Sequence, residues 1–323
     1  MPIYGPDPIN FEGVNGHRYW LDEPFTFTGR HDIDQRLSGF PAAVFLPQHR
    51  PANSTPLVIA LQGMTAPYGW NAFIVPTLTQ MGIAVALFDT PLAGERSLVR
   101  SFTGLVDREV KPLLDYGVSF DTQFWRQSFK CIARDINLVR EFCRDRYNLT
   151  DNRLALFGVS MGVLQSAFAF TAHGIGERLL GAAGHADLQT FAKSWGRLFL
   201  PELAASWAGG VAQKVLSRIQ PDITPMIPIL RMVKNLKYPD DFGRECNPMT
   251  YVEQVKLPRR VRFLIGNADS LVSISDARAC AARFPDGACF AVPGLAHGNI
   301  FHGLTFVDHV RYFLATQLGD WQQ

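Results

Sequence analysis

The stretch LALFGVSMGV, residues 154–163, decides the fold. Its apolar start has the length of a short buried strand, and it runs into Gly158, Ser160 and Gly162 before the chain becomes apolar again. At this glycine and serine content roughly 0.1 matches to G-x-S-x-G are expected by chance, so the pattern needs support from its surroundings. One hydroxyl between two glycines after a predicted strand is typical of a strand–turn–helix elbow.

The two glycines have a physical reason in such an elbow. The central residue takes a strained backbone conformation, and the residues two positions before and after it must be small. Gly158 and Gly162 would let Ser160 stand exposed at the top of a sheet, at the start of a helix predicted over 161–173. The free N–H groups of a helix start favour negative charge, so the Met161 amide is a candidate donor to an oxyanion. On these residues alone, a glycine-rich turn used for packing stays open.

Short apolar runs alternate with helical patterns along the chain. Several runs are apolar at consecutive positions, as expected for a parallel sheet covered by helices on both faces. The runs predicted as strands are 42–46, 57–61, 83–88, 154–157, 179–183, 261–265 and 289–292. Helices are predicted over 69–81, 121–147, 161–173, 275–284 and 304–317. The sequence therefore predicts an α/β fold.

Residues 187–256 interrupt this alternation with helical patterns and no convincing strand. We interpret them as a helical cap or lid inserted into a core made of residues 1–186 and 257–323. The alternative is connecting helix that completes the core. Residues 1–40 are rich in aromatic and turn residues and are expected to wrap the body, and they indicate no function.

A serine hydroxyl becomes a good nucleophile only when a base takes its proton, and an acid must orient that base. Asp269 lies in the loop after the predicted strand 261–265, and His297 lies in the loop after 289–292. Open α/β sheets place functional groups at these carboxyl ends. The chain order Ser160, Asp269, His297 is the order expected for this elbow.

Each of these residues has a competitor. Asp269 could cap the following helix, and Asp276 could take its place, but the Gly–x–x–Asp spacing after the strand favours Asp269. A lone histidine is usually structural, and the position of His297 in this series distinguishes it from the others. The other histidines considered as the base are His173, at the end of a predicted helix, His185, and His302 and His309, at or inside the last helix.

A second oxyanion donor is expected in the loop after the strand 57–61. Gln62-Gly63-Met64-Thr65 follows this strand directly. Gly63 permits a turn that would point the Met64 amide at the same place as the Met161 amide. A plain tight turn is the alternative.

With these residues in order, the chain resembles serine hydrolases of the α/β-hydrolase family over about residues 40–318. The features that carry the resemblance are Gln62-Gly63, Asp89-Thr90-Pro91 with Gly94 and Arg96, Gly158 to Gly162, Gly266 to Asp269, and Gly294 to His297. The resemblance implies a mostly parallel eight-stranded sheet flanked by helices, with a helical cap between Ala183 and Val261. It also implies an acyl-enzyme mechanism.

Two residues depart from the family pattern. Gln62 stands where many members have histidine, and Met161 replaces the commoner glutamine or small residue, which predicts a more apolar pocket wall. A serine at position 160 argues against the dehalogenase and epoxide-hydrolase branches, which use aspartate. It argues equally against dienelactone-hydrolase chemistry, which uses cysteine.

The resulting expectation is a carboxylic ester hydrolase. Ser160 would be the nucleophile, His297 the base and Asp269 its orienting acid, with Met64 and Met161 amides as oxyanion donors. No metal or organic cofactor is implied. The aromatic- and methionine-rich insertion favours an apolar acyl or aryl ester as substrate. The same residues could instead act on a thioester, an amide or peptide, or a carbon–carbon bond, or transfer an acyl group. The fold also serves ligand-binding proteins without catalysis.

Composition narrows the partners. A net charge of +2 gives no electrostatic case for nucleic acid or an anionic membrane. Neither a secretory signal pattern nor an 18-residue apolar window occurs. The five cysteines are odd in number and without C-x-x-C spacing, which favours reduced, buried thiols and a cytoplasmic location. The sequence leaves the oligomeric state open.

Overall fold

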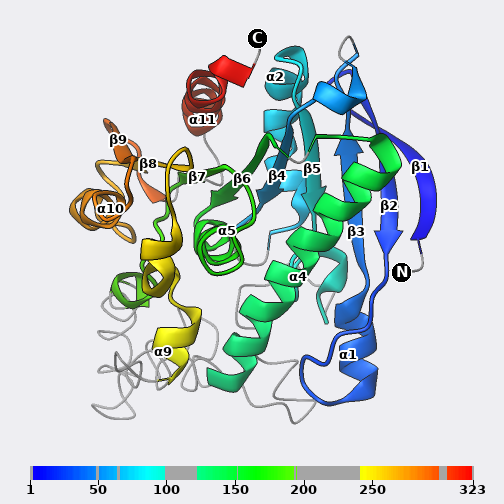
Figure 1. Cartoon of the computed structure of the whole chain (residues 1–323), viewed down its shortest axis with the longest axis horizontal. Helices are drawn as coiled ribbons and strands as arrows, with labels where there is room; N and C mark the ends of the chain where they lie inside the picture. Colours follow the sequence, from blue (N-terminus) through cyan, green and yellow to red (C-terminus); the bar gives the residue numbers. More distant parts are fainter. Residues whose placement is uncertain are drawn as a thin grey trace, which may run out of the picture.

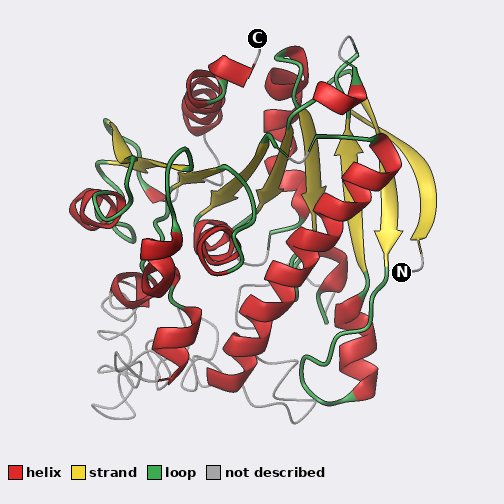
Figure 2. Ribbon diagram, in the orientation of Figure 1, coloured by secondary structure: helices red, strands yellow, loops and turns green. Residues whose placement is uncertain are grey.

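The computed structural model is one mixed sheet covered by helices (Figures 1 and 2). It describes residues 3–48, 51–63, 66–98, 122–150, 152–192, 194, 241–297 and 304–321. Within these residues the sheet has nine strands in the order β1-β2-β3-β5-β4-β6-β7-β8-β9. The strands are β1 (Ile3–Phe11), β2 (Val14–Leu21), β3 (Phe40–Phe45), β4 (Leu57–Leu61), β5 (Ala84–Phe88), β6 (Leu154–Val159), β7 (Arg178–Ala182), β8 (Arg260–Gly266) and β9 (Gly287–Val292).

Strands β4 to β9 are mutually parallel, whereas β1, β2 and β3 pair antiparallel with their neighbours. The central strands β4 and β6 are buried at every position, as their continuous apolar runs predict. Alternate residues of β4 enter two different cores. Leu57, Ile59 and Leu61 belong to one of these cores, and Val58 and Ala60 belong to the other.

Helices supply the other side of each core. In Figure 1, α4 (Thr122–Tyr147) and α5 (Met161–Ala172) lie in front of the sheet, where their buried side chains join the first core. The second core contains residues of α2 (Val75–Gln80) and α11 (Leu304–Gln317). The remaining helices are α1 (His31–Ser38), α9 (Asp241–Cys246) and α10 (Ile274–Ala281), with short 3-10 turns η1 (Ala52–Ser54), η2 (Tyr68–Ile74), η3 (Gly94–Arg96), η6 (Pro248–Gln254) and η8 (Gly319–Trp321).

The predicted helices and strands are confirmed with small shifts of their ends. The apolar stripe of 121–147 forms α4, and Phe129, Ile132 and Ile136 are buried. The prediction over 69–81 is met by η2 followed by α2. The seven predicted strands correspond to β3 to β9. The predicted α/β architecture is therefore present.

The N-terminal region differs from the expectation. Residues 3–21 form a β-hairpin that extends the sheet at one edge, so the described sheet has nine strands instead of eight. Strand β1 is largely exposed and contains Pro6 and Pro8, and proline is tolerated in an edge strand because its missing N–H faces solvent. An exposed, proline-containing edge strand lacks the apolar run by which the other strands are predicted.

The predicted insertion is described at its two ends. Residues 187–192, 194 and 241–256 contain helical segments and no strand, whereas residues 195–240 lie outside the described part of the chain. The cap itself therefore stays a prediction. In the described residues, no helix is both long enough and apolar enough to cross a membrane.

All five cysteines are free, and four of them are buried. Burial raises the pKa of Cys131, Cys246 and Cys280 to about 12, so these thiols are neutral. The prediction of buried, unpaired thiols is confirmed for these residues.

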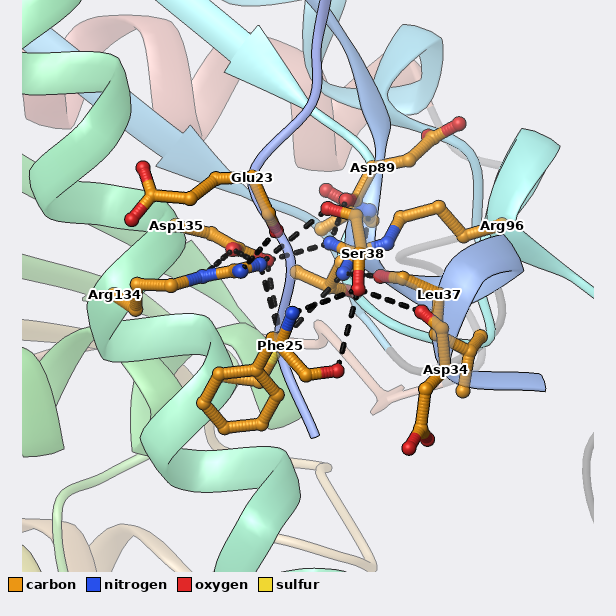
Figure 3. Close-up of polar contacts among 12 residues, drawn as sticks. Glu23, Phe25, Asp34, Leu37, Ser38, Asp89, Arg96, Arg134 and Asp135 are labelled. Atoms are coloured by element: carbon orange, nitrogen blue, oxygen red, sulfur yellow. Dashed lines mark hydrogen bonds and ion pairs between the residues drawn. The ribbon is translucent and has the colours of Figure 1, made fainter. Parts of the chain in front are cut away.

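A buried cluster of charges joins α1, α4 and the loop after β5 (Figure 3). Arg96 and Asp135 are fully buried and form an ion pair of 2.6 Å. The Arg96 guanidinium also donates to the backbone oxygens of Asp89 and Leu37, and Arg134 donates to the second oxygen of Asp135. Because the Asp135 carboxylate pairs with both guanidinium groups, removing it would leave Arg96 buried without a counter-charge.

We predict that Asp135→Ala lowers the free energy of unfolding by about 3–5 kcal/mol, the cost of breaking a buried ion pair on one side. The matched control is Asp145→Ala on the same helix, where an exposed pair with Arg144 should contribute under about 1 kcal/mol. Urea denaturation measures both. If Asp135→Ala does not fold, Asp135→Asn, which retains a carbonyl acceptor, provides the measurement. Equal effects of the variants at positions 135 and 145 would contradict the prediction.

Candidate active site

The polar residues of interest follow the carboxyl ends of neighbouring parallel strands. Gln62 follows β4, Ser160 follows β6, and the loops after β8 and β9 carry Asp269 and His297. The chain crosses over β4 in passing from β5 to β6, so the strand order reverses beside Ser160. Such switch points are where open α/β sheets bind ligands.

Ser160 stands in a sharp turn between β6 and α5. Its φ of 53° and ψ of −119° are unusual for a residue with a side chain. A β-carbon on Gly158 would lie 2.3 Å from the Gly162 oxygen, and one on Gly162 would lie 2.5 Å from the Leu61 oxygen. Both glycines are required because main-chain atoms occupy the space that side chains would need. The predicted elbow is therefore present.

Three side chains form one row of hydrogen bonds. The Ser160 Oγ lies 3.1 Å from His297 Nε2, and His297 Nδ1 lies 2.9 Å from Asp269 Oδ2. The His297 and Asp269 side chains are 7% and 1% exposed. A carboxylate can only accept, so His297 Nδ1 donates to Asp269 and Nε2 is left to accept the Ser160 proton.

Asp269 is held by its own loop. Its Oδ1 accepts hydrogen bonds from the N–H groups of Leu271 and Val272, at 2.9 and 2.8 Å. Those two bonds occupy one oxygen and direct the other at His297. These two backbone hydrogen bonds therefore fix the orientation of the Asp269 carboxylate independently of its contact with His297.

The loops carrying Asp269 and His297 are also tied to each other. The N–H groups of Asn267 and Ala268 donate to the carbonyl oxygens of Val292 and Leu295. A β-carbon on Gly266 would lie 2.0 Å from the Leu295 oxygen, so the two loops touch through their backbones. This contact brings together two residues that are 28 positions apart in the chain.

The overall fold of the chain resembles the folds of known structures. The chain is similar to an acetyl xylan esterase from Paenibacillus sp. R4, with a TM-score of 0.58 and 14% identity, over 98% of this chain and 89% of the other. Est1E from Butyrivibrio proteoclasticus, with ferulic acid bound, gives a TM-score of 0.51 at 15% identity, over 87% and 96% of the two chains. Pyrococcus horikoshii acylaminoacyl peptidase gives 0.56 at 11%, over 87% of this chain and 39% of the other. The chain has the α/β-hydrolase fold.

These similarities establish the fold through shape. No protein-family model matches the sequence, and no curated protein sequence matches it. Identities of 11–15% leave the activity to be argued from the residues at the carboxyl edge of the sheet.

In this α/β-hydrolase fold the competing residues take other places. Asp276 lies in the first turn of α10, and the triad-like row uses Asp269 instead. His173 follows the end of α5, His309 lies inside α11, and His302 lies outside the described residues. His185 is buried, and its Nδ1 accepts from the Asp187 N–H. The structure brings only His297 within hydrogen-bond distance of Ser160 among the described histidines.

The two predicted oxyanion donors differ in what can be described. Met161 is the first residue of α5, where a backbone N–H has no acceptor within the helix. Met64 lies outside the described residues. Its neighbour Gly63 lies beside the serine, because a β-carbon there would be 3.6 Å from Ser160 Cβ. The loop of Met64 therefore starts next to Ser160.

Asp89, after β5, anchors this edge of the sheet through backbone contacts. Its two oxygens accept from the N–H groups of Tyr68 and Glu95, at 2.7 and 2.8 Å. Gly94, with φ of +53°, has no room for a side chain, because a β-carbon would lie 2.1 Å from Asp89 Oδ2. Beside it, Gln62 Nε2 lies 3.5 Å from Thr90 Oγ1. Sequence reasoning found Asp89, Gly94 and Arg96 only through the family resemblance.

A hollow of about 1250 Å³ lies at the other edge of the sheet. Its lining includes Ser54, Asn152 and Arg153, which precede β4 and β6, together with Pro76 and Thr79 of α2. Since Ser160 follows the carboxyl end of β6, this hollow does not open on Ser160.

Asp89 should make stability depend on pH. Burial raises its pKa to about 6 from the usual 3.8, so the folded state holds a proton that the unfolded state releases between these values. Stability from this group is complete below about pH 4 and falls as pH rises through 6, by about 3 kcal/mol. Asp89→Asn should remove this fall, which denaturation at pH 4 to 7 of both proteins would measure. A difference between them that does not change with pH would contradict the prediction.

Proposed function

We propose that the protein is a carboxylic ester hydrolase that works through an acyl-enzyme on Ser160. The observation that carries the proposal is the hydrogen-bonded row of Ser160, His297 and Asp269, with distances of 3.1 and 2.9 Å. The α/β-hydrolase fold and its esterase neighbours support an ester as the bond cleaved.

The first half of the reaction acylates the serine. His297 Nε2 takes the proton of the Ser160 hydroxyl as Oγ bonds to the carbonyl carbon of the ester. The carbonyl oxygen becomes an oxyanion, which the N–H groups of Met161 and Met64 stabilise. When the intermediate collapses, the bond to the alcohol oxygen breaks and His297 gives its proton to the leaving alcohol.

The second half repeats these steps with water. His297 takes a proton from water as its oxygen bonds to the acyl carbon, and the bond to Ser160 Oγ breaks with return of the proton to the serine. Asp269 holds the imidazole in the tautomer that both halves need, and it stabilises the imidazolium that forms in each. Its near-complete burial strengthens this effect, because charges interact more strongly away from water.

An apolar acyl or aryl ester is the proposed substrate. The ferulic acid named with Est1E is an aromatic acid, which favours including esters with an aromatic acyl group among the compounds tested. Cleavage of an amide or peptide is the second candidate, supported by the similarity to an acylaminoacyl peptidase. Turnover of matched ester and anilide substrates with the same acyl group would separate these two candidates.

We predict that Ser160→Ala abolishes hydrolysis of p-nitrophenyl esters and labelling by a fluorophosphonate, because both need the Ser160 oxygen. The control is Ser166→Ala, also a buried serine on this stretch of chain, whose Oγ has no hydrogen-bond partner in the described residues. It should keep both activities. Mass spectrometry of the labelled peptide and circular dichroism check the site and the fold. A folded wild-type protein that binds apolar ligands but resists the probe would instead be a binding protein.

Asp269→Asn should lower kcat by about 10⁴-fold, the loss that the equivalent change causes in serine proteases through the wrong histidine tautomer. Asp276→Asn is the matched control, since that carboxylate lies on α10 outside the row, and it should keep activity close to wild type. Steady-state kinetics with one ester gives both values. A larger loss from the change at position 276 than at position 269 would overturn the role of Asp269.

A further inference from the structure

Two segments that are far apart in the chain meet at Asn247. Asn247 Nδ2 donates to Asp187 Oδ1 at 3.2 Å, and Asn247 Oδ1 accepts from the Leu188 N–H at 3.2 Å. Asp187 stands five residues after the end of β7, and Asn247 stands between α9 and η6. The pair therefore joins the two ends of the interval that contains residues 195–240.

Asn247 is buried and committed to these contacts. It is 3% exposed, and its Oδ1 also accepts from the Met249 N–H at 3.1 Å, which caps η6. Asp187 accepts in addition from the N–H groups of Gln189 and Thr190 and from the Thr190 hydroxyl. Removing the buried Asn247 amide is costly, because the groups that it hydrogen-bonds would lose their partner at a place that water does not reach.

From Asp187 the contacts continue to the nucleophile. The Asp187 N–H donates to His185 Nδ1 at 3.1 Å, and His185 is 1% exposed. Gly184, the residue before His185, packs on the turn at Ser160. A β-carbon on Gly184 would lie 2.6 Å from the backbone carbonyl oxygen of Ser160. The Ser160 N–H donates to the Ala182 oxygen at 2.9 Å. The loop 183–187 is therefore in backbone contact with Ser160.

A second route runs through η6. Met249 and Val252 of η6 enter the same core as α5, and the rings of Tyr251 and Phe168 meet at 6.3 Å. Helix α5 begins directly after Ser160. Asn247 caps η6, which packs on α5, and it also bonds Asp187 in the loop after β7. The positions of both the loop and α5 therefore depend on Asn247.

We infer that Asn247 is a positioning residue for Ser160, acting through Asp187 and the loop 183–187 on one side and through η6 and α5 on the other. The inference rests on the proposed function and assigns a further residue to it. Asn247 does not touch the reacting atoms. Its loss should lower kcat and the rate of labelling while KM changes little, because the nucleophile is displaced and substrate contacts are kept.

The test compares labelling of Ser160 by a fluorophosphonate in four variants of the full chain. Asn247→Ala should slow labelling by up to about 100-fold, the effect of an ångström-scale displacement of a reacting group. Asn247→Asp should slow it at least as much, since it sets one carboxylate against another. Asp187→Ala, which removes the acceptor of Asn247 Nδ2 and leaves Asn247 Oδ1 to cap η6, should slow labelling as well, because it breaks the route through the loop 183–187. Asn137→Ala, which removes an amide bonded to Glu141 on α4, is the matched control and should label like wild type.

The outcomes separate the two proposals. If wild-type protein is not labelled at Ser160, the proposed function fails, and hydrogen exchange of residues 158–168 in Asn247→Ala still tests whether this residue holds the elbow. If wild type is labelled and folded Asn247→Ala reacts at the same rate, the positioning role is wrong. If folded Asp187→Ala is labelled at the wild-type rate, the route through Asp187 is wrong. Thermal melts accompany every variant, so a loss of fold is seen directly.

Discussion

The structure of the carboxyl edge of the sheet, where the candidate site lies, depends on the backbone conformation of Ser160. Ser160 adopts a left-handed conformation between a buried strand and a helix, a strain of about 1–3 kcal/mol that neighbouring structure must impose. Gly158 and Gly162 make the turn possible because backbone atoms fill the space around them. The hydrogen bond from Ser160 N–H to the Ala182 oxygen fixes it from the side of β7. A hydroxyl held out of the helix in this way is available to a base, and the remaining loops are arranged about it.

Much of the fold and of the candidate site could be predicted from the sequence, because the sequence patterns that indicate them are local. The elbow needs two small residues at fixed spacing, and buried parallel strands need continuous apolar runs, so both leave a pattern within ten residues. Asp269 and His297 were placed by a weaker signal, their positions after predicted strands. Position after a strand is informative because parallel strands have their carboxyl ends on one edge of the sheet. Loops that are distant in the chain therefore lie close together there.

The features that escaped prediction are those whose cause is distant in the chain. Strand β1 lies at an edge, is largely exposed and contains prolines, so it carries no apolar run. Arg96 and Asp135 are ordinary charged residues in sequence, and their complete burial depends on packing between the loop after β5 and α4. Asn247 and Asp187 are 60 positions apart, and no periodicity relates them. Met64 and the predicted cap between 195 and 240 lie outside the described residues and remain predictions.

An aspartate held by backbone N–H groups occurs three times along the carboxyl edge of the sheet, and a comparison of the three explains what distinguishes the candidate site. Asp89, Asp187 and Asp269 each follow a parallel strand and accept hydrogen bonds from two backbone N–H groups. In Asp89 each oxygen accepts one of these two bonds, so both oxygens are held by backbone N–H groups. In Asp187 the second oxygen takes the Thr190 hydroxyl, and the first is shared with Asn247, which makes a structural link.

Asp269 alone among these three has both backbone bonds on one oxygen and a histidine on the other. An aspartate after a strand is therefore a loop-forming residue first, and its chemistry is set by what meets the free oxygen. For Asp269 this partner is His297, in the loop after the next strand, β9. The backbones of Gly266 and Leu295 hold the two loops in contact. The candidate acid is thus distinguished by a meeting of two loops, which explains why Asp269 and Asp276 could both be considered from sequence while the folded chain pairs one of them with His297.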